Sequence, residues 1–307
     1  MLKRKDLIDI KSLSEDEILS IIHTAKEMKS KINNPSLRND ELKNKSVVTL
    51  FYENSTRTKM SFMLAADYLG AKPQDLGIAT SSVNKGESLI DTGVTLDQMG
   101  IDAMIIRHSL TGASHLLAKN VNASVINAGD GSNEHPTQAL LDMYSILEEK
   151  GKIEGLNISI IGDIANSRVA RSNIFGLTKL GANVTLSGPS TLLSKNMQTL
   201  SNNVKVTYNI EEGIKNADVI MGLRVQFERQ KKVPFPNNRE YHQLFGLKKD
   251  MLSLAKDDVT IMHPGPVNRG VELSTDVIDS KNSIINEQVK NGVAVRMAIL
   301  KLLLENK

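Results

Sequence analysis

The sequence predicts an α/β fold made of two doubly wound domains, each a mostly parallel sheet flanked by helices. Short β-branched apolar runs alternate with stretches of helical periodicity along the whole chain, as expected for parallel sheets covered on both faces. The length of 307 residues favours two domains, because single cores rarely grow beyond about 250–300 residues. A strongly apolar helix over 289–304 follows the last predicted strand, so we expect it to pack back onto the first domain.

Glycines near the middle of the chain mark the crossing between the two domains. Gly151 and Gly155 interrupt the alternation of strands and helices. A hinge is expected at this crossing and another just before the last helix. We expect the first domain to comprise 1–134 plus 287–307, the second to comprise 149–286, and a helix over 135–148 to connect them.

The first predicted element is a helix that begins after Ser14. Ser14 and Glu17 have the spacing of a capping box, in which each side chain accepts a hydrogen bond from the other residue's backbone N–H. Ile18, Ile21 and Ile22 then recur at helical spacing. This spacing indicates a helix with one buried face.

A polar turn separates the next strand, over 47–51, from a helix. Gly70 marks the end of this helix, because the residue after a helix often has a positive φ, which glycine adopts readily. The turn carries three hydroxyl groups and one guanidinium, from Ser55, Thr56, Arg57 and Thr58. N–H groups in a first helical turn have no helical partner and the dipole is positive there, so the turn suits an anion. A serine N-cap beside a solvated arginine is the simpler alternative, but it explains only one hydroxyl. We therefore favour phosphate binding.

The remaining elements repeat the same strand and helix rhythm. Further strands are expected over 103–106, 124–127, 158–161, 184–186, 204–208, 219–223 and 259–262. Further helices are expected over 89–99, 113–119 and 168–179, and from Pro136 through Leu147. Polar or glycine-rich loops are expected over 79–88 and 129–135, and the longest irregular segment over 226–243.

Arginines follow four separate predicted strands. They are Arg57, Arg107, Arg168 and Arg224. This position matters because open parallel sheets bind ligands beyond the carboxyl ends of their strands. Arginine suits a bidentate grip on carboxylates and phosphates, so the set predicts a strongly anionic ligand or two anionic ligands side by side. Each arginine alone could be a surface charge, and His135 before Pro136 could merely cap a helix. The conjunction of these residues favours a site.

Composition excludes several classes of function. The chain has no cysteine, which removes disulfides, cysteine-ligated zinc and cysteine nucleophiles, and we expect neither a metal nor a cofactor. A net charge of +3 and 4% aromatic residues do not favour nucleic acid. The N-terminus lacks an apolar signal core and no run of about 18 apolar residues exists, so no membrane association is expected and a cytoplasmic protein is the default.

Five motifs together resemble the aspartate branch of the carbamoyltransferases, over essentially the whole chain and in that family's order. They are Ser55-Thr56-Arg57-Thr58, Lys85-Gly86-Glu87, His135-Pro136-Thr137-Gln138, Arg224-Val225-Gln226-Phe227-Glu228-Arg229, and the run His263-Pro264-Gly265-Pro266 with its continuation Val267-Asn268-Arg269-Gly270. The ornithine branch typically carries a cysteine in its late His-Cys-Leu-Pro motif, where this chain has Pro264. Lys59 stands where many relatives have arginine and keeps the charge.

The resemblance implies transfer of the carbamoyl group of carbamoyl phosphate to L-aspartate, an early step toward pyrimidines. It implies that Ser55, Thr56, Arg57 and Thr58 hold the phosphate, and that Thr58, Arg107 and His135 donate to the carbamoyl oxygen. It further implies that the carbamoyl NH2 is held by Gln138 and the backbone carbonyls of Gly265 and Pro266. The aspartate carboxylates would be held by Arg168 and Arg224, with Gln226 nearby. The first domain would then be the carbamoyl phosphate-binding domain and the second the L-aspartate-binding domain.

Lys85 is the residue for which the resemblance implies a role in another subunit. In the family, the loop that carries Ser81, Ser82 and Lys85 reaches a neighbouring subunit's site, which implies a homotrimer with shared active sites. Counting back from Lys85 favours Ser81 over Ser82. Some relatives also dock with a zinc-bearing regulatory chain, and such a partner stays open.

Three rival functions are weighed against this one. A nucleotide-dependent oxidoreductase fits the fold, but the run from Gly162 to Ser167 is not a G-x-G-x-x-G fingerprint and an arginine follows it. A non-catalytic paralogue predicts gaps in the motif set, and there are none. A carbamoyltransferase for another amine is the nearest rival, and Arg168 with Arg224 favours a dicarboxylate acceptor over a cationic one.

Overall fold

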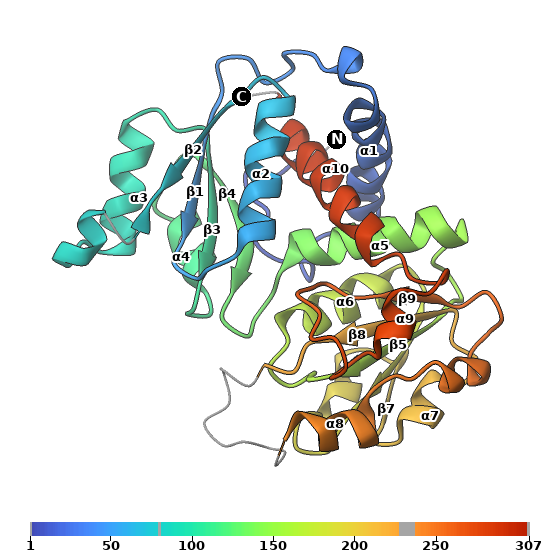
Figure 1. Cartoon of the computed structure of the whole chain (residues 1–307). Helices are drawn as coiled ribbons and strands as arrows, with labels where there is room; N and C mark the ends of the chain where they lie inside the picture. The colour runs from blue at the N-terminus through green and yellow to red at the C-terminus, as the bar shows by residue number, and fades with distance from the viewer. Residues whose placement is uncertain (1, 79–80, 227–236, 306–307) are drawn as a thin grey trace. The chain divides into compact units, whose positions relative to one another are not determined.

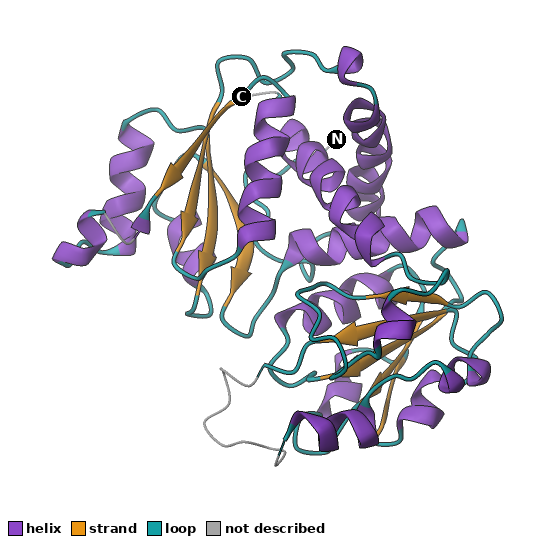
Figure 2. Cartoon of the chain, viewed as in Figure 1, coloured by secondary structure: helices purple, strands orange, loops and turns teal. Residues whose placement is uncertain are grey.

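The computed structural model describes residues 2–78, 81–226 and 237–305, and the chain divides into two compact units. The first unit comprises Met1–Tyr144 with Val289–Lys307, and the second comprises Ser145–Gln288. Each unit contains one β-sheet with helices beside it (Figure 1, Figure 2). The predicted class, two parallel-sheet domains flanked by helices, is confirmed.

The sheet of the first unit has four strands in the order β2-β1-β3-β4. All its ladders are parallel, and Leu50 of β1 pairs with Leu76 of β2 on one side and with Ile106 of β3 on the other. The strands are β1 Ser46–Phe51, β2 Lys72–Leu76, β3 Ala103–His108 and β4 Ser124–Asp130.

The sheet of the second unit has five strands in the order β7-β6-β5-β8-β9, and its ladders are also parallel. β5 lies at the centre, and its Gly162 pairs with Leu223 of β8. The strands are β5 Asn157–Gly162, β6 Asn183–Ser187, β7 Val204–Thr207, β8 Val219–Leu223 and β9 Thr260–Met262.

Helices connect the strands and bury their apolar faces against them. In the first unit they are α1 Glu15–Asn33, α2 Thr56–Tyr68, α3 Leu89–Gln98, α4 Ala113–Ala118, α5 Pro136–Lys150 and α10 Ile285–Leu304, of which α5 and α10 extend into the second. In the second unit they are α6 Arg168–Lys179, α7 Ile210–Ile214, α8 Asn238–Phe245 and α9 Thr275–Ile278. No helix among the described residues is long and apolar enough to cross a membrane.

The core of the first unit shows the alternation expected of a two-sided sheet. Val48 and Leu50 of β1 join a cluster with Leu117 of α4, whereas Thr49 between them lies on the opposite face of the strand. On that opposite side lie α2 and α10 (Figure 1). The guanidinium of Arg296 in α10 lies 5.1 Å from the ring centroid of Phe62 in α2. The prediction that the C-terminal helix packs back onto the first domain is confirmed.

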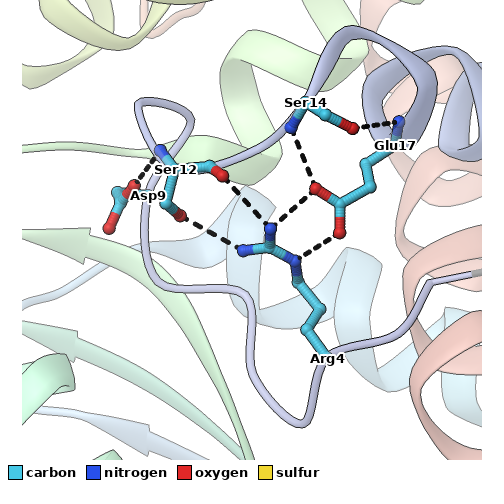
Figure 3. Close-up of polar contacts among 5 residues, drawn as sticks. All are labelled: Arg4, Asp9, Ser12, Ser14 and Glu17. Carbon is cyan, nitrogen blue, oxygen red and sulfur yellow. Dashed lines mark hydrogen bonds and ion pairs between the residues drawn. The ribbon is translucent and has the colours of Figure 1, made fainter.

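The predicted capping box at the start of α1 is present. Glu17 N–H donates to Ser14 Oγ over 3.1 Å, and Ser14 N–H donates to Glu17 Oε2 over 2.9 Å. Arg4 also donates to both oxygens of Glu17 and to Ser12, which ties the N-terminal segment to the helix (Figure 3). Hydrogen bonds from Arg4 and from Ser14, together with the charge of Arg4, lower the pKa of the Glu17 carboxyl.

Four elements differ from the expectations drawn from the sequence. The strand β2 was not predicted, because Lys72–Leu76 is a largely exposed edge strand with polar residues and one proline. The segment 226–243 was expected to be irregular, but α8 begins at Asn238, with Asn237 as its N-cap. The part of that segment over 227–236 lies outside the described residues. β3 and β4 also run further than predicted, to His108 and Asp130.

Candidate functional site

Each sheet has a point at which the direction of its connections reverses. In the first unit this point lies between β1 and β3, and in the second between β5 and β8. Ligands of open parallel sheets bind outside the carboxyl ends of the strands at such a point. Most predicted site residues follow these four strands: Ser55, Thr56, Arg57 and Thr58 after β1, Arg107 at the end of β3, Arg168 after β5, and Arg224 and Gln226 after β8.

The turn after β1 leads into α2, and the N–H groups in the first turn of a helix have no partner within the helix. Ser55 is the N-cap residue in extended conformation, and the described contacts give its side chain no capping hydrogen bond. The simple N-cap alternative is therefore not what the structure contains. Arg57 is exposed in the first turn, whereas Thr58 is buried. The first turn thus presents N–H groups and a cation to solvent.

Arg107 is held at the carboxyl edge of the first sheet. Its Nη1 donates to the carbonyl of Ala128 over 3.3 Å, and its Nε lies 3.6 Å from a carboxylate oxygen of Glu53. The backbone carbonyl of Arg107 accepts from Tyr52 N–H over 2.9 Å. Glu53 and Tyr52 belong to the segment that follows β1, so these contacts join the ends of β1 and β3.

His135 lies at the start of α5 and only 4% of it is exposed. Its carbonyl accepts from the N–H groups of Gln138 and Ala139, which begins the helix. The preceding loop is fixed by two buried carboxylates. Asp130 accepts from Asn127 Nδ2 and from the N–H of Gly112, and Glu134 accepts from Ile10 N–H over 2.8 Å. These contacts therefore fix the loop whose backbone carries His135 into α5.

Gln138 lies one turn into α5 and is buried. Its Nε2 donates to Oδ1 of Asp142 over 2.9 Å, and Asp142 is fully buried. This contact orients the side-chain amide of Gln138.

The loop that precedes α3 carries Lys85 on a short 3₁₀ turn, Ser82–Lys85, closed by Gly86 at a φ of 95°. The ammonium of Lys85 is exposed. Ser81 Oγ donates to the carbonyl of Ile78 over 2.9 Å, and the Ser82 hydroxyl donates to the carboxylate of Glu87. Both serine hydroxyls have partners within this chain, so the choice between them stays a prediction.

In the second unit a fully buried carboxylate connects the loops after β5 and β8. Asp163 accepts from Asn166 Nδ2 over 2.9 Å and from the backbone N–H of Gln226 over 3.3 Å. Gln226 Nε2 in turn donates to the carbonyl of Asn166 over 3.2 Å. Gly162 has a φ of 124°, and a Cβ there would meet the carbonyl oxygen of Leu223 at 2.5 Å, so only glycine allows the two strand ends to approach so closely.

Arg168 is the first residue of α6 and is 4% exposed. Ser167 is its N-cap and accepts from Ala170 N–H over 3.1 Å. A buried cation at a helix N-terminus is opposed by the helix dipole, so the electrostatics of this position favour an anion beside it. Arg224, half-buried, follows β8 directly. The structure places these two guanidinium-bearing residues after neighbouring strands.

Gly265 and Pro266 belong to a loop that is fixed by a buried pair. Gly265 N–H donates to Nδ1 of His263 over 2.8 Å, so the opposite nitrogen of the ring carries the proton and donates to Glu272 over 3.1 Å. Glu272 also accepts from Asn268 N–H over 2.7 Å. The backbone carbonyls of Gly265 and Pro266 therefore come shortly after a residue, His263, whose side chain is fixed by hydrogen bonds.

Three carboxylates were missed by reasoning from the sequence. Asp163, Asp142 and Glu53 contact predicted site residues, but no role was assigned to them. Asp142 stands four residues after Gln138 in a helix, and that spacing is a local but weak signal for the contact. Groups of three or more residues able to hold a metal ion are absent from the part of the chain that the structure describes.

Family models match both halves of the chain. The carbamoyl-P binding domain model of aspartate/ornithine carbamoyltransferase matches residues 5–148, and the Asp/Orn binding domain model matches residues 154–303. The chain is 58% identical to an aspartate carbamoyltransferase catalytic subunit from Acetivibrio thermocellus, over 99% of this chain and 96% of that protein. It is 54% identical to one from Caldanaerobacter subterraneus subsp. tengcongensis, over 99% of both chains.

Solved structures with the same architecture include members of both branches. Aspartate transcarbamoylase from Trypanosoma cruzi, in complex with carbamoyl phosphate and aspartate, matches with a TM-score of 0.87 and 29% identity over 99% of this chain and 98% of that one. Ornithine carbamoyltransferase from Pyrococcus furiosus matches with a TM-score of 0.88 and 30% identity over 98% and 97%. The fold is therefore common to two acceptor specificities.

Proposed function

The chain belongs to the aspartate and ornithine carbamoyltransferase family, and from this premise we propose that it transfers the carbamoyl group of carbamoyl phosphate to L-aspartate. The products are N-carbamoyl-L-aspartate and phosphate, on the route to pyrimidines. Relatives that are 51–58% identical over nearly the whole chain carry the aspartate name, which supports this acceptor over ornithine.

The observation that carries the acceptor assignment is the placement of Arg168 and Arg224 after neighbouring strands of the second sheet. Two guanidinium groups suit the two carboxylates of aspartate, since each can make a bidentate, charge-assisted contact. The side chain of ornithine is cationic and would be repelled by both. We therefore assign aspartate binding to the second unit, with Gln226 as a further contact.

The first unit is proposed to bind carbamoyl phosphate. The N–H groups and side chains of residues 55–58 would hold the phosphate, since a helix N-terminus favours a dianion. The donors aimed at the carbamoyl oxygen would be buried Thr58 and His135 and half-buried Arg107. Negative charge grows on this oxygen in the tetrahedral transition state, and removal of one such donor typically costs about 10²–10³ in turnover.

The chemical step is attack of the aspartate amine on the carbamoyl carbon. The C–N bond forms, the bond from carbon to the phosphate oxygen breaks, and phosphate leaves with the electron pair. The amine must lose a proton, and the leaving phosphate is a suitable acceptor, so the mechanism requires no carboxylate base. Placing two anionic substrates together can supply about 7–11 kcal/mol of the barrier reduction.

We also propose that the active form is a homotrimer with shared sites. Support comes from Lys85, which is exposed on a short 3₁₀ turn. The hydroxyl of Thr92 donates to the carboxylate of Glu87, which attaches the end of this loop to α3. A cation placed in this way can reach a ligand bound to another chain. Mixing of a Lys85→Ala chain with an Arg57→Ala chain tests the proposal, because trimers of mixed composition would regain complete sites and therefore activity. No regain of activity in verified mixed trimers would contradict it.

A substrate panel tests the proposed reaction most directly. Initial rates with carbamoyl phosphate and either L-aspartate, L-ornithine or N-acetyl-L-ornithine should show product with aspartate and little with the two others. A preference for ornithine would overturn the acceptor assignment while leaving carbamoyl transfer intact. No product with any of the three would overturn the proposed function itself.

A further inference from the structure

A buried polar group lies where three helices of the first unit meet. Gln138 and Asp142 lie on α5 and Arg296 lies on α10, with exposed fractions of 7%, 0% and 3%. Gln138 Nε2 donates to Asp142 Oδ1 over 2.9 Å. A core polar contact of this kind is costly unless its partners are matched, so it calls for an explanation.

Arg296 supplies a positive charge to this group and links it to α2. Its Nη1 donates to the carbonyl of Gly292 over 3.0 Å, and its guanidinium carbon lies 5.1 Å from the ring centroid of Phe62. Burial lowers the pKa of Arg296 to about 10, while the negative charge of Asp142 acts in the opposite direction. Arg296 therefore stays protonated at neutral pH and favours an ionised Asp142.

The hydrogen bond to Asp142 Oδ1 shows which way the amide of Gln138 faces, with its NH2 toward the carboxyl group. A carboxylate can accept hydrogen bonds but cannot donate them, whereas an amide has a donating NH2 and an accepting carbonyl. Only the NH2 of Gln138 can face Asp142 favourably. The carbonyl oxygen Oε1, on the same planar carbon, then has to point away from Asp142 as an acceptor.

We propose that Asp142 is a positioning residue that presents the Gln138 carbonyl as a hydrogen-bond acceptor, and that this makes the site selective for an acyl phosphate carrying N–H on its acyl carbon. The inference rests on the proposed function, in which Gln138 contacts the carbamoyl group. Carbamoyl phosphate has an NH2 where acetyl phosphate has a methyl group of similar size. A fixed acceptor distinguishes the two, because a methyl group leaves a desolvated carbonyl without a donor.

The expected magnitude follows from the loss of one oriented hydrogen bond. An asparagine at position 142 can turn either its NH2 or its carbonyl toward Gln138, so the glutamine amide is free to flip. Loss of a neutral hydrogen bond corresponds to about a 3- to 10-fold weaker affinity for carbamoyl phosphate. Binding of acetyl phosphate and of inorganic phosphate should change by less than about 2-fold, since neither uses this acceptor.

Calorimetric titration of the full chain with carbamoyl phosphate, acetyl phosphate and inorganic phosphate tests the inference. In Asp142→Asn the ratio of carbamoyl to acetyl phosphate affinity should fall while phosphate affinity is kept. A general structural defect would weaken all three ligands together and leave the ratio unchanged, and that result would overturn the inference. An original chain that fails to bind carbamoyl phosphate at all would overturn both the proposed function and the inference.

Two further variants keep the test decisive if Asp142→Asn folds poorly. The double variant D142N/R296M removes both buried charges, which often restores stability, and should show the same lowered ratio. Gln138→Met removes the acceptor while keeping the volume. If Asp142 acts through Gln138, adding Asp142→Asn to Gln138→Met should not lower the ratio further. A further fall of about the same size in that background would show that Asp142 acts by another route and would refute the assignment.

Discussion

Asp163 offers the sharpest test of how the second unit is organised. The perturbation is Asp163→Asn, which keeps the size of the side chain but exchanges one accepting oxygen for a donating NH2. Both oxygens of Asp163 accept hydrogen bonds, one from the backbone N–H of Gln226 and both from Asn166. Whichever way the new amide turns, a donor faces a donor, so at least one of the two loops loses its attachment.

The size of the effect follows from burial. Asp163 is fully buried, and a buried donor left without an acceptor costs about 1–3 kcal/mol. If this cost falls on the loop that holds Arg224 and Gln226, kcat/KM for aspartate should fall about 5- to 150-fold. The affinity for carbamoyl phosphate should be nearly unchanged, because Asp163 belongs to the other unit from residues 55–58.

Steady-state kinetics with aspartate as the varied substrate measures the effect, and Asp218→Asn is the matched control. Asp218 is also a buried aspartate of the second sheet, but it accepts from Asn157 N–H at the opposite end of β5 and pairs with Lys256. Its replacement should lower the free energy of unfolding without raising the KM for aspartate. Equal kinetic effects of the two variants, or an unchanged kcat/KM in Asp163→Asn, would refute the reasoning.

Three further predictions concern single side chains. Arg57→Ala should lower turnover by about 10³-fold or more with the assembly unchanged in sedimentation, since Arg57 is exposed and is proposed to hold the phosphate; near-normal turnover would make the phosphate assignment wrong. Arg224→Ala should raise the KM for aspartate and lower kcat, while calorimetry should show unchanged binding of carbamoyl phosphate. Loss of carbamoyl phosphate binding would contradict the assignment of Arg224 to aspartate. Burial lowers the pKa of His108 from 6.5, although the negative charges of Glu53 and Asp130 act in the opposite direction. The folded state therefore holds the neutral imidazole, and the stability that this provides is present above about pH 6.5 and is lost as the pH falls through the folded-state pKa. Urea unfolding of His108→Asn between pH 5 and 7 should therefore show a shallower acid decline than the original chain, and an equal slope would exclude this role.

The strands and helices that were predicted correctly are those that local rules specify. Val219–Leu223 and Arg168–Lys179 match the predicted bounds because a buried parallel strand is a continuous apolar run and a helix has its own period and cap. β2 was missed because its pairing with β1, rather than its own polar sequence, makes it a strand. Edge strands in general carry weak sequence signals for this reason.

The placement of most candidate site residues could be predicted because they follow strands, and in a parallel sheet the carboxyl ends of all strands meet at one edge. Their contacts with ligands stay predictions. The residues that hold these site residues could not be predicted in the same way. Asp163 contacts Gln226 across 63 positions of sequence, so the contact depends on which strands are neighbours. Asp142 is local to Gln138, but an Asp four residues after a Gln is common on exposed helices, and its burial is a property of the folded chain.

Replacing Asp142 or Asp163 by asparagine could either tighten or weaken substrate binding. Both are negative groups that contact residues proposed to bind anions, and electrostatics alone predicts that replacing either by asparagine tightens anion binding, because repulsion is removed. The hydrogen bonds predict the reverse, because each carboxylate holds a donor whose orientation the site requires. Both aspartates are fully buried and accept hydrogen bonds from N–H groups of the residues they hold, so we expect the loss of these hydrogen bonds to outweigh the loss of repulsion. We therefore expect weaker carbamoyl phosphate binding in Asp142→Asn and weaker aspartate binding in Asp163→Asn. Tighter binding in either variant, above all if high salt abolished the gain, would mean that repulsion outweighs positioning in that unit.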